Sequence, residues 1–395
     1  HTYQYRATDA AGNVSDVSTF AVKIDTTPPT SSVQGGGETW HNGTATGVIT
    51  AQDVAGVDRI AYHIVGDSAW TVIVGSRASF DVSGDGVHEY EYNVVDVLGH
   101  VSETRAFQVR IDTLAPTVST TGADDVWHAT DVTVSLSATD PGEPAASGVA
   151  GIEYRRGKSG AWIYQAGGSA DVVVLAAENE GSTLYQYRAM DAAGNTSRIA
   201  TFTVKIDTVA PVSSAQGGGS TWRKAPVTLM FTASDTGSGV DHIEYSLDGE
   251  TWTTAAKLKI GDEGTTSVKY RAVDAVGNVE KVRSTNVNID THGPQTKALR
   301  SFSVKRGKTA TFRYSVLEPN PTGVAMSPIA KVKLVITLKG KVKKTLTLPA
   351  RASNGILRYR WTCKLNRGKY KWSIQATDKA GNSQSKRTWK NLTVK

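Results

Sequence analysis

The stretch that decides the fold runs from Tyr185 to Asn195 and reads Tyr-Gln-Tyr-Arg-Ala-Met-Asp-Ala-Ala-Gly-Asn. Its first part alternates, with Tyr185, Tyr187 and Ala189 on one face and the residues between them on the other. A period of two predicts a β-strand with one buried face. The Asp-Ala-Ala-Gly-Asn end predicts a tight turn, because Asp bonds its own backbone while Gly and Asn accept positive φ.

The same motif recurs along the chain. It stands at Tyr3 to Asn13, in variant form at Tyr90 to His100 and at Tyr270 to Asn278, and in reduced form at Ala376 to Asn382. Its aspartates, Asp9, Asp96, Asp191, Asp274 and Asp378, are 87, 95, 83 and 104 residues apart. Steps of this size correspond to one β-sandwich domain each, and no segment shows a sustained helical period, so we predict tandem antiparallel β-sandwiches.

A second motif, Ile-Asp-Thr followed by proline, comes shortly after each of the first four turns. It includes Ile24-Asp25-Thr26, Ile111-Asp112-Thr113, Ile206-Asp207-Thr208 and Ile289-Asp290-Thr291. Proline has no N–H for a sheet ladder, so it is expected to end the last strand and stiffen a short linker. These motifs divide the chain into a C-terminal half repeat (1–26), three repeats (27–113, 114–208, 209–291) and a basic C-terminal domain (292–395).

A third motif, Ser-Gly-Val-x-x-Ile-x-Tyr, lies between the other two, most clearly from Ser238 to Tyr245. Together the three motifs resemble the bacterial Ig-like and fibronectin type III-like repeats of secreted and surface-attached proteins. The resemblance covers nearly the whole chain. It implies immunoglobulin-like antiparallel sandwiches in an elongated rod, and roles as stalks, adhesin shafts or spacers attached to secreted enzymes.

The chain starts inside a repeat, because residues 1–26 supply only a hairpin that includes Tyr3, Tyr5 and Phe20. A lone two-stranded hairpin is not stable in water. We therefore expect either an upstream part or strands from another chain to complete it, and favour the former. The end at Lys395 reads as a last strand without a wall-sorting tail, so attachment is expected to be noncovalent.

Composition fits a soluble all-β protein. Charged residues make up 21% and apolar residues 39% of the sequence, and no run approaches the ~18 apolar residues of a membrane span. The one cysteine, Cys363, excludes an intrachain disulfide, and its phase in the alternating run Tyr359 to Leu365 points it inward as a small hydrophobe.

We predict that the chain is not an enzyme. No His-Glu-x-x-His, Gly-x-Ser-x-Gly or paired metal-spaced His or Cys occurs, and the eight His are scattered. The stretch Asp81 to Gly86 resembles the start of a calcium loop, but position twelve is Tyr92 where such loops need Glu. An acidic-glycine turn is the better interpretation.

A better calcium candidate is the junction between repeats. There a linker carboxylate could meet a turn aspartate, and an ion held by both would rigidify the array. The candidate residues are Asp25, Asp112, Asp207 and Asp290. The alternative is local, with each turn aspartate bonding only its own backbone. No other cofactor is expected.

Charge is divided unevenly along the chain. Residues 292–395 hold 16 Lys and 8 Arg against Glu318 and Asp378, a net charge of +22 that leaves −15 for the rest. We expect a cationic patch on one face of a hairpin, formed by Lys331, Lys333, Lys339, Lys341, Lys343 and Lys344. The expected partners are an anionic cell-wall polymer or polysaccharide, or the acidic repeats of another copy; nucleic acid would bind only nonspecifically.

Three functions remain open. The leading one is a noncatalytic secreted or cell-surface stalk, shaft or filament component whose basic end contacts an anionic surface. The second is the accessory tail of a large secreted hydrolase. The third is a filament subunit assembled head to tail, with a −15 shaft meeting the +22 end of the next chain.

Overall fold

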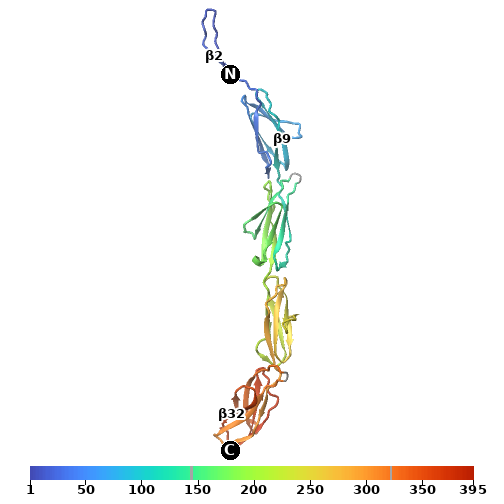
Figure 1. Cartoon of the computed structure of the whole chain (residues 1–395), viewed down its shortest axis with the longest axis vertical. Helices are drawn as coiled ribbons and strands as arrows, with labels where there is room; N and C mark the ends of the chain where they lie inside the picture. Colours follow the sequence, from blue (N-terminus) through green and yellow to red (C-terminus); the bar gives the residue numbers. More distant parts are fainter. Residues whose placement is uncertain (143–145, 321–322) are drawn as a thin grey trace. The chain divides into compact units, whose positions relative to one another are not determined.

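The computed structural model describes residues 1–142, 146–320 and 323–395. Strands make up nearly all of its regular structure, in successive groups that follow the order of the chain (Figure 1). Within the described residues the helical content is one 3₁₀ turn, η1 (Ala176–Glu178). The prediction of an all-β chain of tandem sandwiches is confirmed.

One compact unit, residues 1–126 with 131–205, holds a hairpin and most of two sandwiches. The hairpin pairs β1 (Thr2–Tyr5) with β2 (Ser18–Ala21). The first sandwich has a three-stranded sheet, in the order β3 (Thr30–Gln34), β5 (Ala45–Gln52), β8 (Arg77–Val82). Its other sheet has the order β4 (Trp40–His41), β10 (Arg105–Ile111), β9 (Gly86–Asp96), β6 (Val57–Ile64), β7 (Thr71–Val74).

The second sandwich contains the corresponding strands. They are β11 (Thr117–Thr121), β12 (Trp127–His128), β13 (Val132–Thr139), β14 (Val149–Arg156), β15 (Ile163–Ala166), β16 (Ser169–Val174), β17 (Gly181–Asp191) and β18 (Ala200–Ile206). The motif that opened the sequence argument is β17. Tyr185, Tyr187 and Ala189 are all buried there, as the alternation predicts.

The other compact unit, residues 127–130 with 206–395, contains the third and fourth sandwiches. The third has sheets β19 (Val212–Gln216), β21 (Val227–Ser234), β24 (Lys257–Ile260) and β20 (Trp222–Arg223), β26 (Arg283–Ile289), β25 (Gly264–Asp274), β22 (Val240–Ser246), β23 (Thr253–Thr254). The fourth has sheets β27 (Gln295–Ala298), β29 (Thr309–Leu317), β32 (Ser353–Thr362) and β28 (Phe302–Val304), β34 (Lys390–Val394), β33 (Gly368–Asp378), β30 (Ile329–Leu338), β31 (Lys341–Leu348).

Each sandwich is closed by apolar side chains from the inner faces of its two sheets. In the fourth, Phe312 of β29 meets Trp372 of β33 edge to face, with ring centroids 5.0 Å apart, and both side chains are fully buried. Burying side chains of this size stabilises a fold by about 2–3 kcal/mol each. Cys363 is fully buried in the same core, which confirms its predicted inward direction.

One pairing departs from the predicted antiparallel pattern. The short edge strands β4, β20 and β28 pair parallel to the last strand of their sandwich, β10, β26 and β34 respectively. Trp40 and Trp222 lie on these edge strands and are half-buried.

The hairpin of β1 and β2 keeps an apolar face in solvent. Tyr3 stacks on Phe20 with ring centroids 5.3 Å apart, yet each side chain is about half exposed. Two strands bury too little surface to form a core.

Candidate metal sites beside the linkers

Each linker contains an aspartate, which directly follows the last strand of a sandwich at Asp112, Asp207 and Asp290 and comes four residues after the β1–β2 hairpin at Asp25. The aspartate Oδ1 accepts the backbone N–H of the residue two positions further on, at 2.9–3.1 Å. The acceptor and donor residues are Asp25 and Thr27, Asp112 and Leu114, Asp207 and Val209, and Asp290 and His292. In the last three linkers Oδ2 accepts the N–H of a serine in the following sandwich, Ser147, Ser238 or Ser327. These bonds fix the linker carboxylate against the sandwich that follows.

The turn aspartates make the local bonds that the alternative interpretation predicted. Oδ1 of Asp378 accepts the N–H of Asn382 at 2.8 Å, and Oδ2 accepts its side-chain amide at 3.0 Å. Asp191 and Asp274 bind Asn195 and Asn278 in the same way. These hydrogen bonds account for the recurring shape of the turn without a bound ion.

The asparagine of the turn also reaches the linker. The amide Nδ2 donates to the backbone carbonyl of the linker aspartate, from Asn195 to Asp112 at 2.7 Å, from Asn278 to Asp207 at 2.9 Å and from Asn382 to Asp290 at 2.7 Å. This bond holds the turn next to the linker, so the carboxylate of the turn aspartate lies close to that of the linker aspartate, as predicted from the sequence.

A third carboxylate completes each site. Four groups of three carboxylates form, each with ligand atoms within 4.8 Å of one another: Asp25, Asp53 and Asp96; Asp112, Asp140 and Asp191; Asp207, Asp235 and Asp274; Asp290, Glu318 and Asp378. We call these four carboxylate groups the first to fourth linker triads. A further group, Glu263, Asp290 and His292, shares Asp290 with the fourth triad.

The third members were missed in the sequence. Asp53, Asp140, Asp235 and Glu318 each follow directly on a strand, β5, β13, β21 and β29 respectively. An acidic residue recurs as the first residue after each of these equivalent strands, and this recurrence in the sequence could have identified them.

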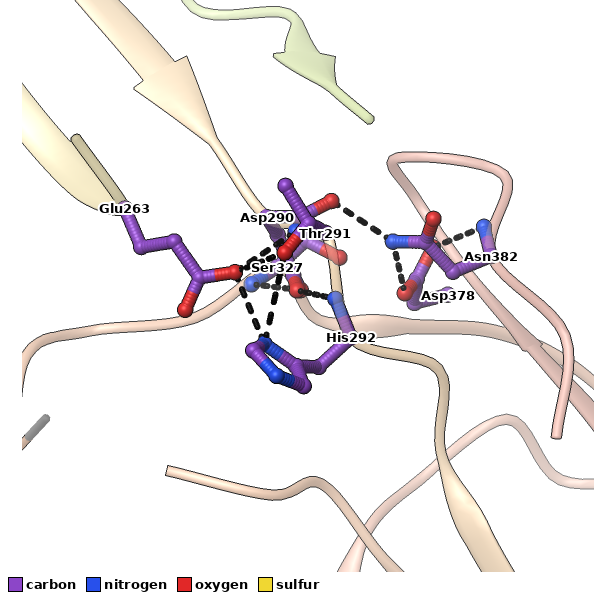
Figure 2. Close-up of polar contacts among 7 residues, drawn as sticks. All are labelled: Glu263, Asp290, Thr291, His292, Ser327, Asp378 and Asn382. Atoms are coloured by element: carbon purple, nitrogen blue, oxygen red, sulfur yellow. Dashed lines mark hydrogen bonds and ion pairs between the residues drawn. The ribbon is translucent and has the colours of Figure 1, made fainter. Parts of the chain in front are cut away.

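The fourth triad has both acids of the basic C-terminal segment. Figure 2 shows Asp290 beside Asp378 and Asn382, with Ser327 bound to Asp290. Both carboxylate oxygens of Glu318 are shielded from solvent and have no hydrogen-bond partner. Within the described residues no lysine or arginine forms an ion pair with this triad.

Unpartnered buried oxygens recur in two other triads. They are Oδ2 of Asp25 and Oδ1 of Asp140. Leaving a buried acceptor without a donor costs about 1–3 kcal/mol, and more when the group is charged. Among the described residues, the fourth triad has two such oxygens and no basic partner, which is a fit to a cation.

The electrostatics agree with this geometry. Burial, together with the charges of Asp290 and Asp378, raises the pKa of Glu318 to about 8. Burial also raises the pKa of Asp140. The hydrogen bond from the Gly148 N–H opposes this shift, and the negative charge of Asp112 adds to it. These carboxyls take up a proton readily because no cation faces them.

The first triad differs because His100 replaces the turn asparagine. His100 Nδ1 lies 2.6 Å from Asp96 Oδ2, and this bond raises the pKa of His100. The pKa of Asp96 is lowered, since the bonds from His100 outweigh burial. The first triad therefore has a basic partner in His100, at the position where the other triads have asparagine.

A second acidic group caps the other side of the linker. Glu263 Oε1 accepts the Thr291 N–H at 3.0 Å and lies 2.7 Å from His292 Nδ1 (Figure 2). Asp85 caps Thr113 in the same manner at 2.8 Å. Asp81, in the calcium-loop-like stretch, accepts the Thr46 hydroxyl on a neighbouring strand.

Comparison with known proteins gives a family for the C-terminal part of the chain. Residues 306–390 match the family model described as a bacterial Ig-like domain. The C-terminal sandwich therefore contains a bacterial Ig-like domain. The structure as a whole consists of tandem Ig-like and fibronectin III-like modules.

One curated relative is Exoglucanase B of Cellulomonas fimi, 28% identical over 285 residues. The match covers 68% of this chain and 23% of the relative, so the chain spans about a quarter of that protein's length.

Three solved structures are similar to parts of this chain. The fibronectin(III)-like modules of Clostridium thermocellum CbhA are 16% identical, with a TM-score of 0.28, and cover 47% of this chain and 94% of theirs. A bacterial ice-binding adhesin is 17% identical, with a TM-score of 0.33 and coverage of 67% and 100%. The outer capsid protein Hoc of bacteriophage RB49 is 13% identical, with a TM-score of 0.36 and coverage of 71% and 99%.

The lysines predicted as one patch on the C-terminal Ig-like domain do not share one face. A bulge between Ile336 and Thr337 shifts the register of β30 against β31. Lys341 and Lys344 then oppose Leu338 and Ile336, whose side chains pack in the core.

The other predicted lysines lie elsewhere on the domain. Lys331 and Lys333 alternate with buried Val332 and Leu334 and so belong to the outer face. Lys343 is left unpaired by the bulge, and Lys339 occupies the turn after β30.

Among the described residues no helix is long and apolar enough to cross a membrane.

Proposed function

We propose that the chain is a noncatalytic spacer of an extracellular or cell-surface bacterial protein, whose linkers are fixed by calcium ions. The observation that carries this proposal is the fourth linker triad, where Asp290, Glu318 and Asp378 converge and Glu318 has two buried oxygens without partners. The tandem noncatalytic modules support the role of spacer.

The donor set favours calcium over other common ions. The triads offer oxygen ligands alone, and Ca²⁺ prefers six to eight oxygens from carboxylates, carbonyls and water in flexible geometry. Zinc prefers His and Cys, and Mg²⁺ demands a tighter octahedron. In the fourth site Asp290, Glu318 and Asp378 would hold the ion, which supplies positive charge and no chemistry.

The expected consequence is stiffening of each linker. One ligand belongs to the linker and two to the following sandwich, so an ion held by all three resists separation of the strand end from the turn. Binding to the folded state alone adds about 2.7 kcal/mol of stability at a free calcium concentration 100 times Kd.

Thermal unfolding of the full chain tests this function. We expect midpoints to rise with excess Ca²⁺ relative to EDTA, and to rise less with Mg²⁺ at equal ionic strength. The matched control is D85N, which alters a linker cap that belongs to none of the metal-ligand groups. Equal midpoints in Ca²⁺ and EDTA at about pH 8, where Glu318 ionises, would overturn the calcium part.

A second candidate is an accessory region of a secreted hydrolase. The similarity to part of Exoglucanase B specifically favours it. Sequencing the gene on both sides of these residues decides between the two: a hydrolase domain in the same reading frame supports the accessory role, and further repeats support the stalk.

The basic C-terminal domain is proposed as the attachment point. Its net charge of +22 suits an anionic polymer outside the cell, and binding that weakens with salt is the expected behaviour. The same charge would let the basic domain pair head to tail with the part of another copy that has a net charge of −15. Sedimentation at low and high salt tests this assembly.

A further inference from the structure

A groove on the outer face of the C-terminal Ig-like domain combines cations with one aromatic ring. It has a volume of about 380 Å³ and is lined by Thr337, Lys339, Gly340, Lys369, Lys371 and Trp389. This volume falls in the range of about 300–1,000 Å³ that small-ligand sites occupy. Three of its six residues are lysines that the predicted patch had mostly left out.

The strand register explains why these side chains meet. Lys369 and Lys371 alternate on β33 with Tyr370 and Trp372, whose side chains are buried, so both lysines point away from the core. Lys371 is opposite Thr337 on β30. The groove therefore rests on the rigid centre of the five-stranded sheet.

Trp389 supplies the apolar wall. It is 39% exposed and, among the described residues of 292–395, it is the aromatic side chain left open to solvent. An exposed indole is costly to leave in water and is a frequent contact residue in binding sites.

Lys339 points to a functional constraint. It is the one residue other than glycine with positive φ, at +47°, in the described part of the chain. It precedes Gly340 in the turn between β30 and β31, where Asn-Gly or Gly-Gly would fit with less strain. A lysine that is kept in a strained position beside a groove indicates that its charge is used there.

Negative charge is absent from the groove lining. Both acids of residues 292–395, Glu318 and Asp378, belong to the fourth linker triad. The complementary ligand is thus an anion whose apolar ring face can lie on Trp389. A sugar acid has both features. Single-stranded nucleic acid usually stacks its bases on several successive aromatic rings, and this groove offers one.

We propose that this groove binds an anionic polysaccharide, with Trp389 contacting a sugar ring and Lys339, Lys369 and Lys371 its carboxylates. The inference rests on the proposed attachment of the basic domain to an anionic polymer, and it names the site and the ligand class.

Titration of the full chain with polygalacturonate at low salt tests the site. The variants are W389A and the pair K369A/K371A; the control is K341A/K344A, which removes the same charge from the other side of the sheet. We expect Kd to rise about tenfold for W389A, because the contact with the sugar ring is lost, and to change less than about twofold for the control. K339N should weaken binding while it raises the melting temperature.

The outcomes separate this inference from the proposed attachment. Equal losses for K369A/K371A and K341A/K344A, with none for W389A, would leave diffuse charge attraction and overturn the groove. No binding to polygalacturonate by the unchanged protein would overturn both. Stronger binding of oligo-dT that depends on Trp389 would assign the groove to nucleic acid and overturn the polysaccharide.

Discussion

The first and fourth linker triads solve one electrostatic problem in two ways. Around Asp25, Asp53 and Asp96 the turn carries His100, whose ring lies 2.6 Å from Asp96 and supplies a positive charge. Around Asp290, Glu318 and Asp378 the turn carries an asparagine, and no basic side chain of the described residues pairs with the triad. The comparison teaches that a common scaffold fixes the carboxylates, while one turn residue decides whether the site needs an outside cation.

The largest effect is expected from Asp378→Ala. This change removes the acceptor of the Asn382 N–H and of its side-chain amide, and it frees Asn382 from the turn. We expect the free energy of unfolding of the C-terminal domain to fall by about 2–4 kcal/mol, because buried donors are left without acceptors. Denaturant unfolding, followed by tryptophan fluorescence, measures it. A loss below about 0.5 kcal/mol would contradict the assigned turn bonds.

The second prediction concerns pH in the absence of calcium. The folded pKa of Glu318, about 8, lies above its unfolded value, so its contribution to stability is complete below the unfolded pKa and is lost as pH rises toward 8. In EDTA, stability of the unchanged chain should fall relative to Glu318→Gln between about pH 5 and 8. One pKa unit corresponds to about 1.4 kcal/mol, and partial exposure of the group reduces the effect.

Calcium should reverse this slope. If the ion binds the ionised triad, the unchanged chain gains stability on raising the pH in excess Ca²⁺, whereas E318Q gains little. Parallel melting curves of the two proteins at all pH values would show that Glu318 has an ordinary pKa and no role at the linker.

Much of the fold was predictable because it depends on short-range patterns. Alternation in β17 and the Asp-Ala-Ala-Gly-Asn turn specify strands and turns within about ten residues, and their recurrence gives the number of sandwiches. The parallel edge strand β28 was not predictable, since its partner β34 lies about ninety residues away.

The candidate sites were predictable in part. The linker and turn aspartates belong to conspicuous motifs, and the structure brings them together. Glu318 follows an ordinary alternating strand, and only comparison with Asp53, Asp140 and Asp235 at the equivalent strand ends could have indicated that its side chain joins them. The lysine patch failed for another reason, because the bulge after Ile336 reverses which side chains share a face.

A smaller effect is expected from His100→Asn, which gives the first triad the turn residue of the others. The raised pKa of His100 means that its pairing with Asp96 stabilises the fold below the unfolded pKa and is lost as pH rises through the folded pKa. The variant should lose this pH dependence and should respond more to calcium below neutral pH. An unchanged pH profile, measured by thermal unfolding of both proteins, would contradict the role of an internal cation.

The most direct test of the account is calorimetric titration of the full chain with Ca²⁺ at about pH 8, compared with Glu318→Gln and with the control Asp85→Asn. The account predicts saturable binding whose stoichiometry falls by one site in E318Q and is unchanged in D85N. Absence of saturable heat, or equal stoichiometry in all three proteins, would contradict the claim that the linker triads hold calcium.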